Sequence, residues 1–538
     1  MCDKDIKKLA LAHLWVAFGA FGVASLLGFY QVVERSGLIP ALKSPALYYG
    51  SVSTHGVLMA FVLTTFFIMG FGYHTAANNG AGFNRCAAWA GFWVAAVGTL
   101  LAALPLLTGN ASVLFTFYPP MQAHPLFYIG ATLLVVGSWV WCVLMVMAAG
   151  AWKQANPGAA MPLPLFATTG NAILWLWSSV GVALEVVFQL IPWSLGLVDT
   201  IDVGLARTLF SWTLHPIVYF WLIPAYIALY SFVPLAAGGK LFSEELARAA
   251  FVLIVVFGLP IGFHHLYMDP MQASGWKLAH GVGTYVVAIP TLITAFTVIA
   301  SLEMAGRARG GQGLFGWIGA LPWNQPMVLA AGLSLLMLLL GGFGGLVNAS
   351  YAMNAMVHNT AWVPGHFHLI FAGTVVTLYF AVAYRLWPSL TGKAFRKPCL
   401  VLGQLWSWFG GMAILTTPWH ILGLLGQPRR ISSVEYDSPL VQSWGAYEAI
   451  MIAGGLVLLL SALLFVYNLA SAHWQGEASG EDTVAYAEPL HPPGKIPALL
   501  NGYAVWNWVI LLLMAASFGY PIAQFFLMKT FDSSPWGY

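Results

Sequence analysis

Long apolar stretches dominate this sequence and restrict the folds open to it. A membrane-spanning helix needs about 20 mostly apolar residues, and only 7% of this chain is charged, against about 25% in soluble domains. So few charges exclude a soluble enzyme, a disordered chain and a nucleic-acid binder. The sequence therefore predicts an all-α membrane protein with thirteen transmembrane helices at 9–31, 48–74, 86–107, 124–152, 166–192, 207–236, 247–268, 277–305, 325–349, 358–386, 399–425, 443–470 and 501–528.

The basic residues predict the orientation of this bundle. With a cytoplasmic N-terminus, alternating loops place 14 of the 21 Lys and Arg on the cytoplasmic side, as the positive-inside rule requires. The longest polar segment, 471–500, is then a cytoplasmic loop between the last two spans. No segment predicts a separate soluble domain, so residues 1–538 are expected to form a single transmembrane domain.

The cysteines exclude several kinds of site. The four residues are Cys2, Cys86, Cys142 and Cys399, and no two of them form a Cys-x-x-Cys pair. This argues against a zinc site, a disulfide framework and covalently attached c-type haem.

Histidines carry most of the functional information. An ionisable group inside a membrane span is costly and indicates a functional site by default, and neutral imidazole is the commonest metal ligand. Counted from the predicted ends, six histidines on four spans share one depth near the outer face, which favours metal binding. They are His55, His215, His264, His265, His366 and His368. His13 and His420 are instead interpreted as hydrogen-bonded packing residues.

Local spacing limits which of these histidines share a metal. His366 and His368 point about 200° apart on a helix, so each would hold a different metal. His264 and His265 are about 100° apart, so they can share a metal only at a helix end or on a distorted backbone, which Pro260 could supply. Tyr219 lies four residues after His215, on the same helical face.

These motifs together resemble subunit I of the haem-copper oxidases. The motifs are Ser-Thr-His-Gly at 53–56, His-Pro-Ile-Val-Tyr-Phe-Trp at 215–221, Gly-Phe-His-His at 262–265, Val-Pro-Gly-His-Phe-His at 363–368 and the arginine pair at 429–430. The resemblance implies that residues 1–538 form one catalytic domain that reduces O2 to water by four electrons and pumps protons.

The same resemblance implies the cofactors and their ligands. A low-spin haem, expected to be b-type, would be bound by His55 and His368. A high-spin haem, expected to be a-type with b-type as the alternative, would be bound by His366. A copper ion, CuB, would be bound by His215, His264 and His265, with Tyr219 cross-linked to His215 as the catalytic residue. The haem propionates would lie near Arg429, Arg430, His358 and Asn354.

The sequence departs from the usual family pattern at two positions, and the first of them indicates a branch of the family. Ile217 stands where mitochondrial-like oxidases have a Glu at the end of a proton channel, and this resembles the B-family. Asn354 stands where the family usually has an Asp. The remaining proton route would use Tyr226, Tyr230, Thr291 and Thr294. Thr297 is interpreted as bonding only to its own helix.

Partners and rival functions follow from the same pattern. The chain has no binuclear copper motif, so electrons are expected from a subunit II with a copper centre, supplied by cytochrome c or a similar small carrier. The expected location is a bacterial or archaeal plasma membrane. Two alternatives remain: a nitric oxide reductase of the same superfamily, whose members lack the tyrosine, and a secondary transporter with no redox cofactor.

Overall fold

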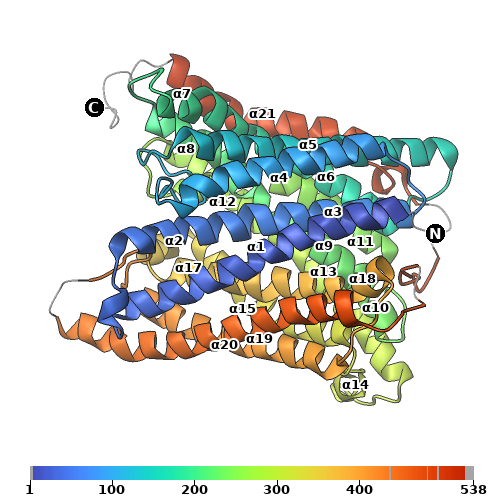
Figure 1. Cartoon of the computed structure of the whole chain (residues 1–538). Helices are drawn as coiled ribbons and strands as arrows, with labels where there is room; N and C mark the ends of the chain where they lie inside the picture. The colour runs from blue at the N-terminus through green and yellow to red at the C-terminus, as the bar shows by residue number, and fades with distance from the viewer. Residues whose placement is uncertain (1–3, 435–437, 481–482, 493–495, 528–538) are drawn as a thin grey trace.

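The computed structural model describes residues 4–434, 438–480, 483–492 and 496–527, and these are almost entirely helical (Figure 1). The first elements are α1 (Lys4–Ser36), η1 (Pro40–Leu42), α2 (Pro45–Val57), η2 (Leu58–Leu63), α3 (Thr64–Asn78), α4 (Arg85–Leu107), α5 (Pro125–Ala155), α6 (Leu163–Glu185), η3 (Val186–Leu190), α7 (Ile191–Ser194), α8 (Val203–Leu214), α9 (Pro216–Ser231), α10 (Val233–Ala236) and α11 (Glu244–Gly258). They are followed by η4 (Phe263–Leu266), α12 (Ser274–Val286), α13 (Ala288–Ala308), α14 (Gly316–Ala320), α15 (Pro326–Ala349), α16 (Tyr351–Val357), α17 (Trp362–His368), η5 (Leu369–Val376), α18 (Thr377–Thr391), α19 (Pro398–Leu424), α20 (Pro439–Gln475), η6 (Ala498–Leu500) and α21 (Ala504–Leu527).

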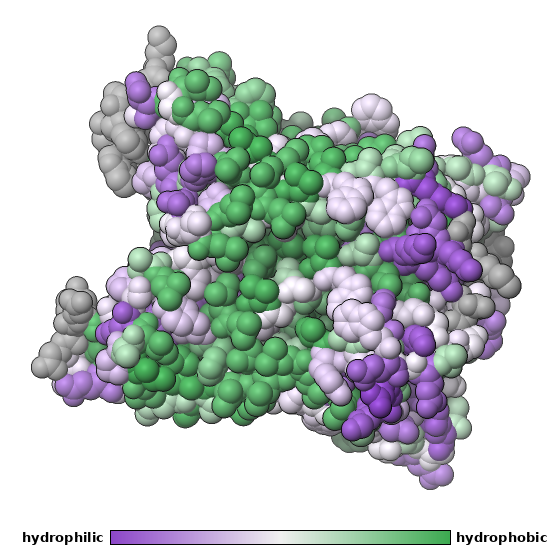
Figure 2. Space-filling view, viewed as in Figure 1, coloured by the Kyte–Doolittle hydropathy of each residue, from purple (hydrophilic) through white to green (hydrophobic). Residues whose placement is uncertain are grey.

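Twelve helical spans in the described ranges are long and apolar enough to cross a membrane. They match twelve of the thirteen predicted stretches, and Figure 2 shows their apolar side chains as a continuous belt between two more polar ends. The all-α membrane fold predicted from the sequence is therefore confirmed.

The seventh predicted stretch, 247–268, is helical only in part. Helix α11 ends at Gly258, two residues before Pro260, because proline lacks an N–H and disfavours helical geometry in the residue before it. The chain then continues as an irregular segment into the 3-10 turn η4, which carries His264 and His265. Gly262 allows this segment to approach α8, since a Cβ at this position would clash with the carbonyl of Ser211.

Other boundaries also differ from the prediction. Helix α20 extends to Gln475, so the loop predicted at 471–500 begins as helix. Farther along, this loop folds back on the bundle, where the Ala487 N–H donates to the Ser231 carbonyl at 2.7 Å. Helix α1 begins at one end of the bundle and α21 ends at the other (Figure 1).

Three spans form the interior of the bundle. In the most apolar part of each span, 94% of the residues of Val203–Ala236 are buried, 83% of Pro45–Asn78 and 78% of Trp362–Thr391, against 28% of Ala504–Leu527. These three spans carry His55, His215, His366 and His368. The histidines therefore lie on the helices that neighbouring protein shields most completely from lipid.

The interior spans are irregular where they carry these histidines. His215 sits in the break between α8 and α9, next to Pro216. The π-helical segment η2 follows His55 by three residues, and the π-helical segment η5 directly follows His368. Such segments are rare and are frequently found at functional sites.

Candidate metal centre

All six histidines of the predicted layer line one cavity of about 1490 Å³. Pockets for drug-sized ligands usually measure about 300–1,000 Å³, so this cavity can take more than one such group. The shared depth predicted from the sequence therefore corresponds to a shared cavity.

Three of the histidines form a compact group. Each of His215, His264 and His265 offers one ring nitrogen, and these nitrogens lie within 4.8 Å of one another. The ring centroids of His215 and His264 are 4.5 Å apart, and those of His264 and His265 are 4.3 Å apart. The Nε2 atom of His215 is buried and has no hydrogen-bond partner among the described residues. Three neutral imidazoles in this arrangement fit one copper or zinc ion.

Two adjacent histidines can share this site because they lie outside a regular helix. His264 and His265 belong to the 3-10 turn after α11, as the sequence required for a shared metal. Tyr219 lies beside the group, with its ring 5.0 Å from that of His215 at an interplanar angle of 62°. The structure therefore brings the His215 imidazole and the Tyr219 phenol close together, as the four-residue spacing predicts.

His55 and His368 face each other across a gap. Their rings are nearly parallel, at 13°, and their centroids are 6.3 Å apart. This gap is too wide for ring contact, but it leaves room for one metal ion bonded to a nitrogen of each ring at about 2 Å. The pair therefore fits the two axial ligands of one haem iron.

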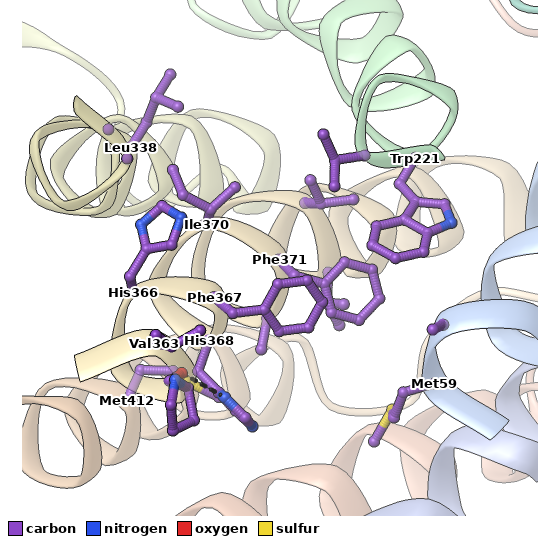
Figure 3. Close-up of a pocket in the computed structure, with 18 of the residues that line it drawn as sticks. Met59, Trp221, Leu338, Val363, His366, Phe367, His368, Ile370, Phe371 and Met412 are labelled. Carbon is purple, nitrogen blue, oxygen red and sulfur yellow. Dashed lines mark hydrogen bonds between the residues drawn. The ribbon is translucent and has the colours of Figure 1, made fainter. Parts of the chain in front are cut away.

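His366 points to the other side of the same helix. Figure 3 shows its ring beside Leu338 of α15, whereas His368 lies beside Met412 of α19. Glycines of α15 leave room for the ring, since a Cβ at Gly344 or Gly345 would lie 3.1 or 3.2 Å from it. The opposed directions of His366 and His368 therefore fit two different metals, as their spacing predicts.

The three haem-ligand candidates share one hydrogen-bonding pattern. The Nδ1 atoms of His55, His366 and His368 each lie 2.8 Å from a backbone carbonyl, those of Ala24, Gly341 and Pro364 respectively. A carbonyl only accepts, so each Nδ1 carries the proton and donates it. This tautomer leaves each Nε2 free to bind a metal.

The histidines interpreted as packing residues differ from these three in location, because they lie outside the cavity. The Nδ1 atoms of His13 and His420 bond the carbonyls of Leu9 and Thr416, four residues earlier on their own helices. Neither residue lines the cavity. The structure agrees with the packing interpretation.

The predicted proton-route residues contact one another in pairs. The Tyr226 hydroxyl lies 3.2 Å from that of Thr291, and the Tyr230 hydroxyl lies 2.8 Å from that of Thr294. Thr297 donates to the Ile293 carbonyl of its own helix at 2.8 Å, as predicted. Helices α9 and α13 are therefore joined by two hydroxyl pairs, one turn apart.

Basic residues gather at one end of the cavity. Arg429, Arg430, His358 and Asn354 all line it. Burial and the neighbouring Arg430 lower the pKa of Arg429 to about 9. Neither arginine forms an ion pair with a described residue, and Arg429 donates to the amide oxygen of Asn359 at 2.8 and 3.1 Å. This end of the cavity is therefore suited to an anionic group such as a haem propionate.

Further polar residues of the cavity were not predicted. Glu185 is fully buried, lines the cavity just before the π-helical segment η3, and has no hydrogen-bond partner on either oxygen among the described residues. Arg207, which also lines the cavity, pairs with Asp269 at 2.6 Å. The sequence did carry a signal for Glu185, because an acidic residue within an apolar span indicates a functional site.

The comparisons with known proteins agree with this geometry. The sequence model of the family described as "Cytochrome C and Quinol oxidase polypeptide I" matches residues 8–457. The chain is 41% identical to "Cytochrome c oxidase subunit 1" of Thermus thermophilus, over 97% of this chain and 95% of that protein. It is 26% identical to the protein of the same name from Thermostichus vulcanus, over 89% of this chain and 85% of that one.

The chain belongs to the cytochrome c and quinol oxidase polypeptide I family.

A solved structure supports this family and its fold. The structure is described as "Cryo-EM structure of a heme-copper terminal oxidase dimer provides insights into its catalytic mechanism". It matches with a TM-score of 0.91 and 36% identity, over 96% of this chain and 92% of that chain. The resemblance to haem-copper oxidase subunit I is therefore confirmed, and the histidines of the cavity fit the haems and copper that this family implies.

Proposed function

We propose that this chain is the catalytic subunit of a terminal respiratory oxidase, which reduces O2 to water by four electrons and pumps protons. The observation that carries the proposal is the convergence of six histidines on one cavity as a three-nitrogen group, a facing pair and a single ring. The names of the relatives, cytochrome c oxidase subunit 1 and a haem-copper terminal oxidase, support the same activity.

Each ligand then has a distinct task. His55 and His368 hold a low-spin haem, His366 holds a high-spin haem, and His215, His264 and His265 hold CuB. A haem held by both His55 and His368 would supply electron transfer, whereas a haem held by His366 alone, together with copper held by the three other histidines, would supply the site for O2. The expected haem types are b for the low-spin site and a for the high-spin site.

The chain's own residues supply protons to that site. Tyr219, cross-linked to His215, holds a phenol proton beside the copper ligands. Tyr226, Tyr230, Thr291 and Thr294 lead away from it as a row of hydroxyls that can relay protons from the cytoplasm. At the other end of the cavity, Arg429 and Arg430 bind the haem propionates, near His358 and Asn354.

The proposed setting is a single catalytic domain, 1–538, in a bacterial or archaeal plasma membrane, with the N-terminus in the cytoplasm. Electrons would come from cytochrome c or a similar carrier, through a subunit II with a binuclear copper centre. The name of the Thermus relative, a numbered subunit, fits such an assembly.

Cofactor analysis of the purified complex tests the proposal. We expect a reduced-minus-oxidised spectrum with two haem populations, and one copper bound to this subunit in addition to any copper of subunit II. A preparation without haem bands would contradict the proposal and favour the transporter alternative.

Parallel assays with O2 and NO separate the oxidase from a nitric oxide reductase. Tyr219 beside the His215 ring favours O2, since those reductases lack this tyrosine. The NO assay is still needed, because Glu185 places a carboxyl group in the same cavity. We expect O2 consumption with ascorbate and a dye or cytochrome c as donor. Turnover of NO without consumption of O2 would rule out our assignment.

Two threonines on α13 test the proton route. Thr294→Val removes the hydroxyl that partners Tyr230, whereas Thr297→Val removes one that bonds only its own helix. We expect Thr294→Val to slow O2 reduction by about 100-fold, the scale of a lost proton-transfer group, and Thr297→Val to stay near the wild-type rate. The measurement is steady-state O2 consumption at equal haem content. Equal rates in the two variants would contradict the route.

A further inference from the structure

Helix α12 turns one polar face toward the segment that carries His264 and His265. Lys277, His280 and Thr284 follow one another at helical spacing, one per turn, and each of them bonds residues of the segment 262–269. A polar side chain inside an apolar span costs free energy unless it has a partner, so its position there indicates a role. In this case the partners all belong to the loop that bears two of the three proposed copper ligands.

Lys277 holds the C-terminal end of this loop. Its ammonium group donates to the carbonyls of Tyr267, at 3.1 Å, and of Asp269. These carbonyls follow the 3-10 turn η4 and have no continuing helix to bond them. Lys277 thereby fixes the point at which the chain leaves the histidine pair.

His280 holds the N-terminal end of the loop. Its Nδ1 atom accepts hydrogen bonds from the Gly262 N–H at 3.0 Å and the Phe263 N–H at 3.2 Å. Its ring also stacks on Phe263, with centroids 4.1 Å apart and an angle of 14° between the planes. A nitrogen that accepts two N–H groups carries no proton, so His280 acts here as a buried acceptor for the segment after the broken end of α11.

Thr284 contacts a proposed copper ligand directly. Its hydroxyl lies 2.8 Å from the His280 carbonyl, which can only accept, and 2.9 Å from Nδ1 of His264. The hydroxyl hydrogen therefore goes to the carbonyl, and the oxygen accepts from Nδ1–H of His264. This chain of bonds sets the tautomer of His264 that leaves Nε2 free for a metal.

We infer that the α12 face formed by Lys277, His280 and Thr284 positions the copper ligands, and that Thr284 sets the orientation and tautomer of His264. The inference rests on the proposed copper site. A regular helix would direct His264 and His265 about 100° apart, and the three side chains hold the non-helical path on which both rings face one ion. None of the three takes part in the chemistry itself.

Thr284→Val and Thr284→Ser form the matched test. Valine keeps the shape of threonine without the hydroxyl, whereas serine keeps the hydroxyl. In the purified complex we expect Thr284→Val to lose copper to a chelator roughly 10- to 100-fold more readily than wild type, the usual effect of removing such a partner. We expect Thr284→Ser to retain copper. The infrared stretch of CO transferred to copper after photolysis should shift only in Thr284→Val.

His280 provides an independent pair of variants. His280→Asn keeps a hydrogen-bond acceptor near the position of Nδ1, whereas His280→Leu removes it, and both lose the ring stacked on Phe263. We expect His280→Asn to hold copper more tightly than His280→Leu. If the leucine variant does not fold, the Thr284 pair alone decides the inference.

The low-spin haem spectrum separates the possible failures. Its ligands, His55 and His368, lie outside the α12 contacts, so an unchanged spectrum shows an intact fold in every variant. Copper retention and a CO band identical to wild type in Thr284→Val would overturn the inference and leave the oxidase assignment standing. A wild-type complex without copper would instead overturn the proposed function.

Discussion

Replacing His215 by alanine is expected to abolish O2 reduction. The three ring nitrogens within 4.8 Å make His215 one of only three protein ligands of the proposed copper site. Its loss would also remove the proposed cross-link to Tyr219. We expect turnover to fall to background and copper content to drop, as measured with an oxygen electrode and by metal analysis at equal protein concentration.

The low-spin haem should survive this change. His55 and His368 face each other at 6.3 Å on other spans, and neither depends on the copper group. His13→Asn is the matched control, since His13 is a buried histidine that bonds its own helix and lies outside the cavity. It should keep copper and turnover. Wild-type activity in His215→Ala would refute the copper assignment.

Tyr219→Phe should stop turnover for a different reason. The change keeps the aromatic ring beside His215 but removes the phenol proton. Loss of a positioned proton donor costs about 10²- to 10⁴-fold, and we expect at least the upper part of this range because Tyr219 is also the proposed cross-link partner of His215. The three histidines remain, so copper should be retained, and this separates the variant from His215→Ala.

Tyr384→Phe controls for removal of a buried hydroxyl. The Tyr384 hydroxyl bonds Gln404 and Asn468 and lies outside the cavity. O2 consumption, haem spectra and copper content should all stay near wild type in this variant. Rapid turnover of Tyr219→Phe would show that the phenol is dispensable.

The sequence predicted most of the site because its chemistry is local. The two-residue spacing of His366 and His368 already placed them on opposite sides of one helix, and the structure has them there. The four-residue spacing of His215 and Tyr219 likewise predicted their contact. Twelve of the predicted spans were also found, since length and apolarity alone determine them.

Features that depend on packing between spans could not be predicted. The end of α11 at Gly258 had a local signal in Pro260, but the apolar run continued through it and gave the appearance of a complete span. The contacts of Lys277, His280 and Thr284 required knowledge of which loop lies against α12. Glu185 had a signal, as an acidic residue within an apolar span, but the sequence does not show that its carboxyl group faces the cavity.

The facing imidazoles of His55 and His368 constrain how the protein is made. One ring belongs to the first half of the chain and the other to the second, whereas the three proposed copper ligands all lie between them in the sequence. For the proposed low-spin haem, the ribosome must therefore deliver the tenth predicted span before the second protein ligand is present. Both ligands can hold this haem only late in the synthesis of the chain.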